Sequence, residues 1–149
     1  MEQSEKDLLA QLAKAHLSVL DTLELTEEQQ LYLVSVEGHA LGLIDNPSDD
    51  VVKVAIAQNG YAIGFMVNPS EELQLLAVDN NPIAIDDIKN PTMAVRARAI
   101  ALEPNAIVFI DNPTEVEQLM AVSLDPGAYA HIMQPTKTVT SLYNKLQRP

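Results

Sequence analysis

The sequence predicts an all-α fold, an α-solenoid of about six 22-residue repeats, each with one long and one short helix. The first observation is an internal repeat, because residues 40–61, 62–83, 84–105, 106–127 and 128–149 align without a single insertion. The second is a set of residues at fixed positions: each copy begins with alanine and has proline at its eighth position. The third is composition, since apolar residues make up 47% of the chain but aromatic residues only 4%. Such a repeat is typical of solenoids, in which each unit buries its apolar face against its neighbours.

The N-terminal segment is expected to cap the array. Ser4 and Asp7 have the spacing of a capping box ahead of an apolar series, which predicts a helix over about residues 5–23. A second capping box begins at Thr26 and predicts a helix that runs through Val36 in a degenerate copy of the repeat. The first helix is longer than any helix of the repeat, so we expect it to cover the open end of the stack.

Each regular repeat is predicted to hold two helices. Asn-Pro pairs such as Asn46-Pro47 place asparagine at a helix cap and proline in the first helical turn, ahead of a helix of about twelve residues. A cap-type residue followed by proline or glycine, as in Asn81-Pro82, then ends this helix and starts one of about eight residues. One position of the long helix is always small, and we expect close helix packing there: Ala55, Ala77, Ala99 and Ala121.

The whole chain is expected to form one domain, because the repeat argues against a division. The last copy has an unusually polar long helix, as expected for a C-terminal cap that faces water. The predicted parts are an N-terminal capping helix (1–25), a degenerate repeat (26–39), four regular repeats (40–127) and a C-terminal capping repeat (128–149).

The Asn-Pro punctuation, the short paired helices and the Val95-Arg96 pair resemble the leucine-rich-repeat-variant and short HEAT-like helical arrays of bacterial and bacteriophage proteins. The resemblance covers residues 40–149. It implies a curved, one-dimensional stack of helix pairs and a binding rather than a catalytic role. It carries no catalytic residue over to this chain.

Negative charge is concentrated in the first part of the repeat array. The chain has a net charge of −12, and residues 18–87 contain thirteen acidic residues but one basic residue, Lys53. Direct binding to nucleic acid is disfavoured there, because such binding depends on cations that displace counterions from phosphate. Ordinary solubility is the competing interpretation of this charge.

Cysteine is absent, which excludes disulfides and thiolate chemistry and fits a reducing compartment. The N-terminal residues are acidic and contain no long apolar run, so we expect neither a signal peptide nor a membrane span. The expectation is a soluble, cytoplasmic protein that does not bind membranes.

No pattern in the sequence points to catalysis, a cofactor or a metal. His16, His39 and His131 occupy unrelated repeat positions, and a solenoid keeps distant repeats apart. Paired acids in the first turn of a helix are best explained by the helix dipole. Arg96 and Arg98 are interpreted as a solvated helix face, with a small basic patch for phosphate or for the array's own acids as the alternative. We therefore expect a protein that is not an enzyme.

The favoured hypothesis is a protein–protein interaction module whose acidic surface binds a basic or nucleic-acid-binding partner. A sharper version is that the acids imitate nucleic-acid phosphate and inhibit such a partner, as an anti-defence protein would. This version requires the carboxylates to share one continuous face. The alternative is a structural or self-assembling component of a larger particle, and a homo-oligomer stays open. The predicted partner-binding residues are Asp45, Asp49, Asp50, Glu71, Glu72, Asp79, Asp86, Asp87, Phe65 and Phe109.

Overall fold

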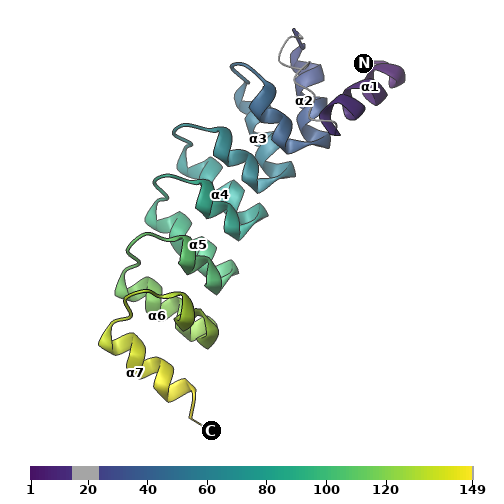
Figure 1. Ribbon diagram of the computed structural model, residues 1–149. Helices are drawn as coiled ribbons and strands as arrows, with labels where there is room; N and C mark the ends of the chain where they lie inside the picture. Colours follow the sequence, from purple (N-terminus) through teal and green to yellow (C-terminus); the bar gives the residue numbers. More distant parts are fainter. Residues whose placement is uncertain (15–23, 149) are drawn as a thin grey trace.

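The computed structural model describes residues 1–14 and 24–148. These residues form helices and connecting turns without a strand, and the helices pack in series, each against its neighbours along the chain. Figure 1 shows a gently curved array with the N-terminus at one end and the C-terminus at the other. The prediction of an all-helical array of serially packed units is confirmed for this part of the chain.

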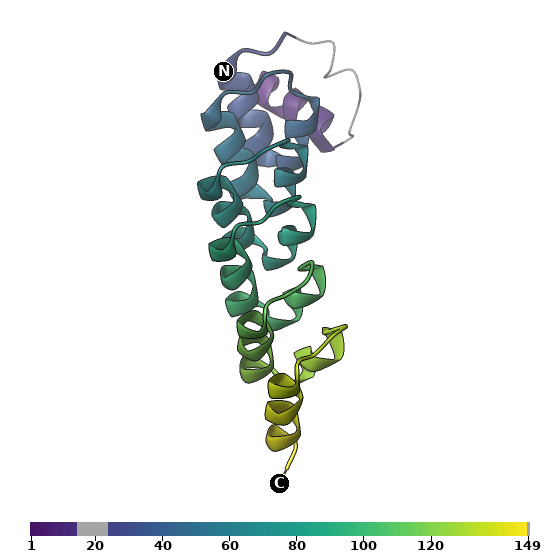
Figure 2. The same ribbon diagram turned by 90° about the vertical axis from the view of Figure 1, so that its left-hand side faces the viewer.

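Two kinds of helix alternate along the array. From α2 onward a ten-residue α-helix begins every 22 residues, and a six-residue 3-10 helix lies between each pair of successive α-helices. Figure 2 shows the α-helices stacked in one column and the 3-10 helices in a second column beside it. The helices are α1 (Gln3–Lys14), α2 (Glu27–Val36), η2 (Gly38–Leu43), α3 (Asp49–Gln58), η3 (Gly60–Phe65), α4 (Glu71–Asn80), η4 (Pro82–Asp87), α5 (Met93–Leu102), η5 (Pro104–Phe109), α6 (Glu115–Leu124), η6 (Pro126–His131) and α7 (Lys137–Leu146).

The N-terminal helix α1 packs against α2 and buries Leu9. Ser4 lies inside α1, so the predicted capping box at Ser4 is wrong. The predicted extension of this helix to residue 23 lies outside the described residues. The second predicted capping box is confirmed, because Thr26 accepts a hydrogen bond from the backbone of Gln29 and the Gln29 side chain accepts one from the backbone of Thr26.

Serine or threonine, rather than asparagine, caps the ten-residue helices. Ser48 Oγ accepts a hydrogen bond from the N–H of Val51 at 3.4 Å, which satisfies one of the free donors at the helix start. Asn46 adopts a positive φ of 49° immediately before Pro47, so both residues belong to the turn outside the helix. The predicted asparagine cap, the proline in the first turn and the length of twelve residues are therefore wrong. The caps are Thr26, Ser48, Ser70, Thr92, Thr114 and Thr136.

The second junction in each repeat follows the prediction more closely. The residue that ends a ten-residue helix also caps the 3-10 helix: Asn59 Oδ1 accepts from the N–H of Tyr61 at 3.1 Å, and Asn81 Oδ1 accepts from Ile83 at 3.0 Å. The short helix that follows has six residues in 3-10 geometry instead of the expected eight. A tighter helix is common in such short connecting segments.

The core consists of small and branched aliphatic residues in register from one repeat to the next. The alanine that recurs at one position of α3 to α6 is fully buried, and the branched residue after it, such as Ile100 or Val122, also has 0% exposure. A second alanine row lies in the 3-10 column, where Ala62 and Ala84 are fully buried. Small and large side chains thus alternate, which lets adjacent helices approach closely. The predicted buried positions of the long helix are Ala55, Ala77, Ala99 and Ala121, and all four are buried.

Candidate protein-binding surface

The first two residues of the α-helices form a continuous row along one side of the array, which we call the amino edge. Successive α-helices start 22 residues apart and pack against each other, so their N-terminal ends lie side by side (Figure 1). Contacts across this row confirm the arrangement: Ser48 Oγ donates to Glu27 Oε1 at 2.6 Å, between the starts of α3 and α2. In α2, α3 and α4 every residue of the row is acidic: Glu27, Glu28, Asp49, Asp50, Glu71 and Glu72.

The acidic part of the amino edge is exposed and only partly neutralised. Lys53 Nζ lies 3.0 Å from Glu72 Oε1, and this hydrogen bond and charge raise the pKa of Lys53, with smaller contributions from Asp49 and Asp50. Among the described residues, no cation lies within ion-pair distance of Asp49, Asp50 or Glu71. Three of the carboxylates are therefore available to an external cation.

The other predicted acidic residues do not lie on the amino edge. Asp79 stands near the end of α4, at the opposite side of the column, and accepts a hydrogen bond from Arg98 Nε at 2.6 Å. Asp86 and Asp87 are exposed at the end of η4, in the 3-10 column. Asp45 is exposed in the bend that leads to α3. The structure thus divides the predicted acids among separate surfaces instead of bringing them together on one face.

The two phenylalanines belong to the 3-10 column. Phe65 is 48% exposed and lies over Gly42, where an added Cβ would come within 2.5 Å of its ring. The edge of its ring also meets His39, with 5.9 Å between ring centroids. Phe109 is partly buried against the core. Both phenylalanines end 3-10 helices, whereas the amino edge consists of α-helical residues.

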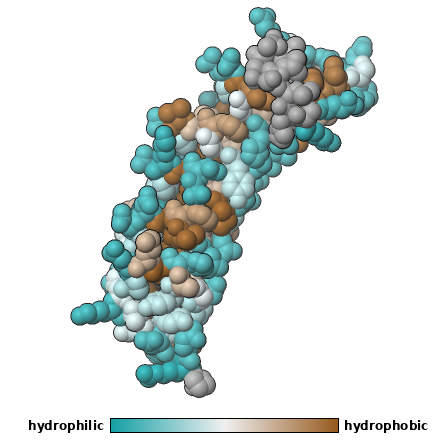
Figure 3. Space-filling view, viewed as in Figure 1, coloured by the Kyte–Doolittle hydropathy of each residue, from teal (hydrophilic) through white to brown (hydrophobic). Residues whose placement is uncertain are grey.

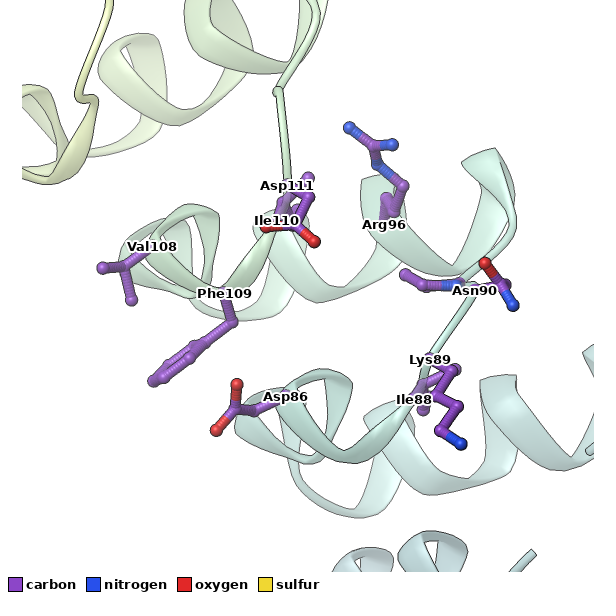
Figure 4. A pocket seen from close by; sticks show the side chains of 10 residues that line it. Asp86, Ile88, Lys89, Asn90, Arg96, Val108, Phe109, Ile110 and Asp111 are labelled. Atoms are coloured by element: carbon purple, nitrogen blue, oxygen red, sulfur yellow. The ribbon is translucent and has the colours of Figure 1, made fainter. Parts of the chain in front are cut away.

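A groove of about 480 Å³ lies between η4, η5 and the turns that follow them. Figure 4 shows Asp86 and Phe109 at one end of it and Lys89 and Asn90 at the other. Arg96 lines the groove, but its guanidinium belongs to an internal ion pair: Nη2 donates to Glu117 Oε2 at 2.8 Å, and Nε lies 2.8 Å from Oε1. The groove therefore combines Lys89 with the exposed acids Asp86 and Asp111, so its lining does not carry charge of a single sign.

Arg96 and Arg98 do not form the solvated helix face that was expected, because each lies in an ion pair. Arg96 retains 19% exposure and its partner Glu117 retains 7%, so this pair is largely buried between α5 and α6. Arg98 is half-exposed and pairs with Asp79 on the preceding helix. Both arginines bind the array's own acids, which is the alternative that the sequence left open.

Buried glutamines form contacts that sequence reasoning missed. Gln74 Nε2 donates to the carbonyl of Pro69 at 3.0 Å, while its Oε1 accepts from the N–H of Thr92 in the next repeat at 3.3 Å. Two repeats later, Gln118 makes the equivalent pair of contacts with Pro113 and Thr136. Their separation of 44 residues, twice the period, is the sequence signal that could have revealed this bridge.

The amino edge loses its paired acids after α4. Met93 and Ala94 open α5, whereas Glu115 and Val116 open α6. Met93 and Val116 are each 75% exposed. Figure 3, viewed as in Figure 1, shows hydrophobic side chains gathered near the level of α5 and hydrophilic ones over the C-terminal end.

Within residues 1–14 and 24–148, no group of three or more histidine and acidic side chains is arranged to hold a metal ion. His39 and His131 lie at unrelated places in the array, and His16 lies outside the described residues. In the same ranges, no helix combines the length and the apolar character needed to cross a bilayer. No family model matches the chain, and comparisons with curated proteins and with solved structures give no significant match.

Proposed function

We propose that the chain is an α-solenoid of six helical units that binds a basic segment of another protein along the acidic part of its amino edge. The single observation behind this proposal is the row of six carboxylates at the starts of α2, α3 and α4. Neighbouring helices are spaced by about 10 Å, so the row spans about 20 Å. Such a row attracts and orients a lysine- or arginine-rich segment.

Imitation of nucleic acid has less support than simple charge complementarity. That function calls for one continuous acidic face, whereas Asp79, Asp86 and Asp87 lie apart from the amino edge. The proposed partner is therefore a basic protein segment. The alternative of self-assembly predicts a mass that depends on concentration.

The test compares two variants that lose the same number of carboxylates. The edge variant carries Asp49→Asn, Asp50→Asn and Glu71→Gln; the control variant carries Asp86→Asn, Asp87→Asn and Asp111→Asn. A fluorescent lysine-rich peptide is titrated into each protein at low and high salt, after circular dichroism has confirmed that the helices are intact. Both variants have the same net charge, so a difference in affinity would show that the position of the carboxylates, and not their number, determines binding.

We expect the edge variant to bind at least about fivefold more weakly than the control, with a smaller dependence on salt, because exposed charges are screened within about 10 Å at 0.1 M salt. Equal affinities would overturn the assignment of the binding surface to the amino edge. A mass that rises with concentration in the absence of peptide would favour self-assembly instead.

A further inference from the structure

The groove between η4 and η5 is lined by charges of both signs that do not pair with one another. Asp86 and Asp111 are exposed acids of its lining, and Lys89 is an exposed base. Among the described residues, neither acid has a cation within ion-pair distance, and Lys89 has no acid there. The charges are therefore held apart within one groove, where an external ligand can reach them.

The groove lies where the glutamine bridge between repeats is missing. Gln74 and Gln118 each join the carbonyl of a turn proline to the N–H of the threonine that caps the next α-helix. Arg96 occupies the equivalent position in α5 and pairs with Glu117 instead. The carbonyl of Pro91 consequently lacks the side-chain donor that the equivalent prolines have, and Pro91 lines the groove. An acceptor without its usual partner thus accompanies the unpaired charges.

The two ends of the groove attract different chemical groups. Figure 4 shows Asp86 and Phe109 at one end, and a carboxylate and an aromatic ring both attract an ammonium group. Lys89 and Asn90 lie at the other end and carry N–H donors, which suit a carboxylate. The volume of about 480 Å³ is in the range of pockets that hold small ligands.

We propose that this groove binds a ligand in which an apolar part joins an ammonium group to a carboxylate. The ammonium group contacts Asp86 and Phe109, and the carboxylate contacts Lys89 and Asn90. Val108, which is 50% exposed, contacts the apolar part. A ligand with charge of one sign would be repelled at one end of the groove. The groove contains none of the six carboxylates of the amino edge, so this inference does not depend on the proposed function.

The same chemistry occurs in small aliphatic amino acids and in protein segments that carry a basic and an acidic side chain. The probe for a segment is a tripeptide of lysine, leucine and glutamate with both ends blocked. In two single-charge peptides, glutamine replaces either the lysine or the glutamate. The probe for a small molecule is ε-aminocaproate, which carries both charges on one aliphatic chain. Each probe is titrated into the isotope-labelled protein at low salt, and the backbone amide signals are followed by NMR.

Two variants each remove one charge from the groove, Asp86→Asn at one end and Lys89→Gln at the other. The control for the first is Asp87→Asn, because Asp87 is the next residue and is also exposed but does not line the groove. The control for the second is Lys137→Gln, at the exposed start of α7. Each variant and its control have the same net charge.

We expect the dipolar tripeptide to bind about threefold more tightly than either single-charge peptide, as is typical of one exposed charge contact. Its binding should shift the signals of residues 89–90 and 108–111. Asp86→Asn should weaken only the peptides that contain lysine, and Lys89→Gln only those that contain glutamate, while the controls bind as the wild type does.

Equal affinity for all three peptides, or a loss in a control as large as in its groove variant, would overturn the inference. So would unchanged signals at residues 89–90 and 108–111 with both dipolar probes. If ε-aminocaproate binds more tightly than the tripeptide, the ligand is a small molecule; if the tripeptide binds more tightly, the ligand is a protein segment. Either result supports the dipolar groove and identifies the source of its ligand.

Discussion

The junctions at the starts of the 3-10 helices are built in two ways, one in the first part of the array and another in the rest. At η3 the N–H of Gly60 donates to Asn80 Oδ1, and at η2 that of Gly38 donates to Gln58 Oε1, both at 2.7 Å. Further along, proline starts the 3-10 helix, and leucine replaces the amide at the end of the next α-helix. The prolines are Pro82, Pro104 and Pro126, and the leucines are Leu102, Leu124 and Leu146.

This difference shows that a donor and its acceptor change together across two repeats. A buried N–H without a partner costs free energy, so Gly60 requires the amide of Asn80. Proline has no N–H to satisfy, and an apolar side chain can then stand where the acceptor stood. The smallest independent unit of the array is therefore the interface between two neighbouring repeats, rather than a single repeat.

The largest effect is expected at the buried ion pair between α5 and α6. Arg96→Met should lower the free energy of unfolding by about 3 kcal/mol, because Glu117 would be left buried without its counter-charge. The measurement is chemical denaturation followed by circular dichroism. Arg98→Met, which removes an exposed pair, should cost below about 1 kcal/mol. Recovery in Arg96→Met with Glu117→Gln would confirm the cause, and equal losses for the two single arginine variants would contradict it.

Gly60→Ala should cost about 2.5 kcal/mol, since the added Cβ would lie 2.5 Å from the backbone carbonyl of Ala77. Gly64→Ala is the matched control, because its Cβ would meet Asp87 at an ordinary 3.4 Å. Thermal and chemical unfolding of both variants check the prediction. A loss at Gly64 as large as that at Gly60 would show that the close approach at the junction is not the cause.

Asn80→Leu should cost about 2 kcal/mol because it leaves the N–H of Gly60 without an acceptor. Leu102→Asn, the reverse change at a proline junction, should cost below about 1 kcal/mol, since Pro82 offers no donor. A double-mutant cycle that combines Asn80→Leu with Gly60→Pro tests the pairing directly. The double variant should be about 1 kcal/mol more stable than the sum of the two single losses predicts. If the two single losses simply add in the double variant, the donor at position 60 and the acceptor at position 80 are not coupled.

The smallest effect concerns Lys53, in the first part of the array. Glu72→Gln should lower the pKa of Lys53 toward its ordinary value of 10.5, because Glu72 is the main cause of its elevation. The raised pKa stabilises the fold below the unfolded pKa, and this contribution is lost as the pH rises through the folded value. An NMR titration of the lysine side chain measures the change, and an unaltered titration would show that the contact is not formed in solution.

The repeat and its buried rows could be predicted from the sequence, because Ala55 and its equivalents recur without an insertion. The cap at Thr26 was assigned correctly, but the α-helix caps of the regular repeats were not, since Asn46 and Ser48 are both good capping residues two positions apart. The positive φ of Asn46 before proline decides between them. The 3-10 geometry was missed because six residues leave too little pattern to distinguish two helix types.

The candidate surface was predictable only in part. The acidic pairs of α3 and α4 were expected to be exposed in first turns, and they are. The separation of Asp86 from them depends on which column a residue occupies, and a one-dimensional repeat does not contain that information. The ion pairs Arg98–Asp79 and Arg96–Glu117 join residues 19 and 21 positions apart. In a 22-residue repeat, such separations identify neighbours on adjacent helices.

The constant 22-residue spacing of the α-helices also determines how this protein can change its size. A duplicated unit placed at an Asn-Pro turn should keep every later row in register, because the described units pack in series, each against its neighbours along the chain. Each added copy would lengthen the edge by about one helix spacing, about 10 Å. Tandem duplication or loss of a unit would thus change the length of the array in fixed steps of one helix spacing.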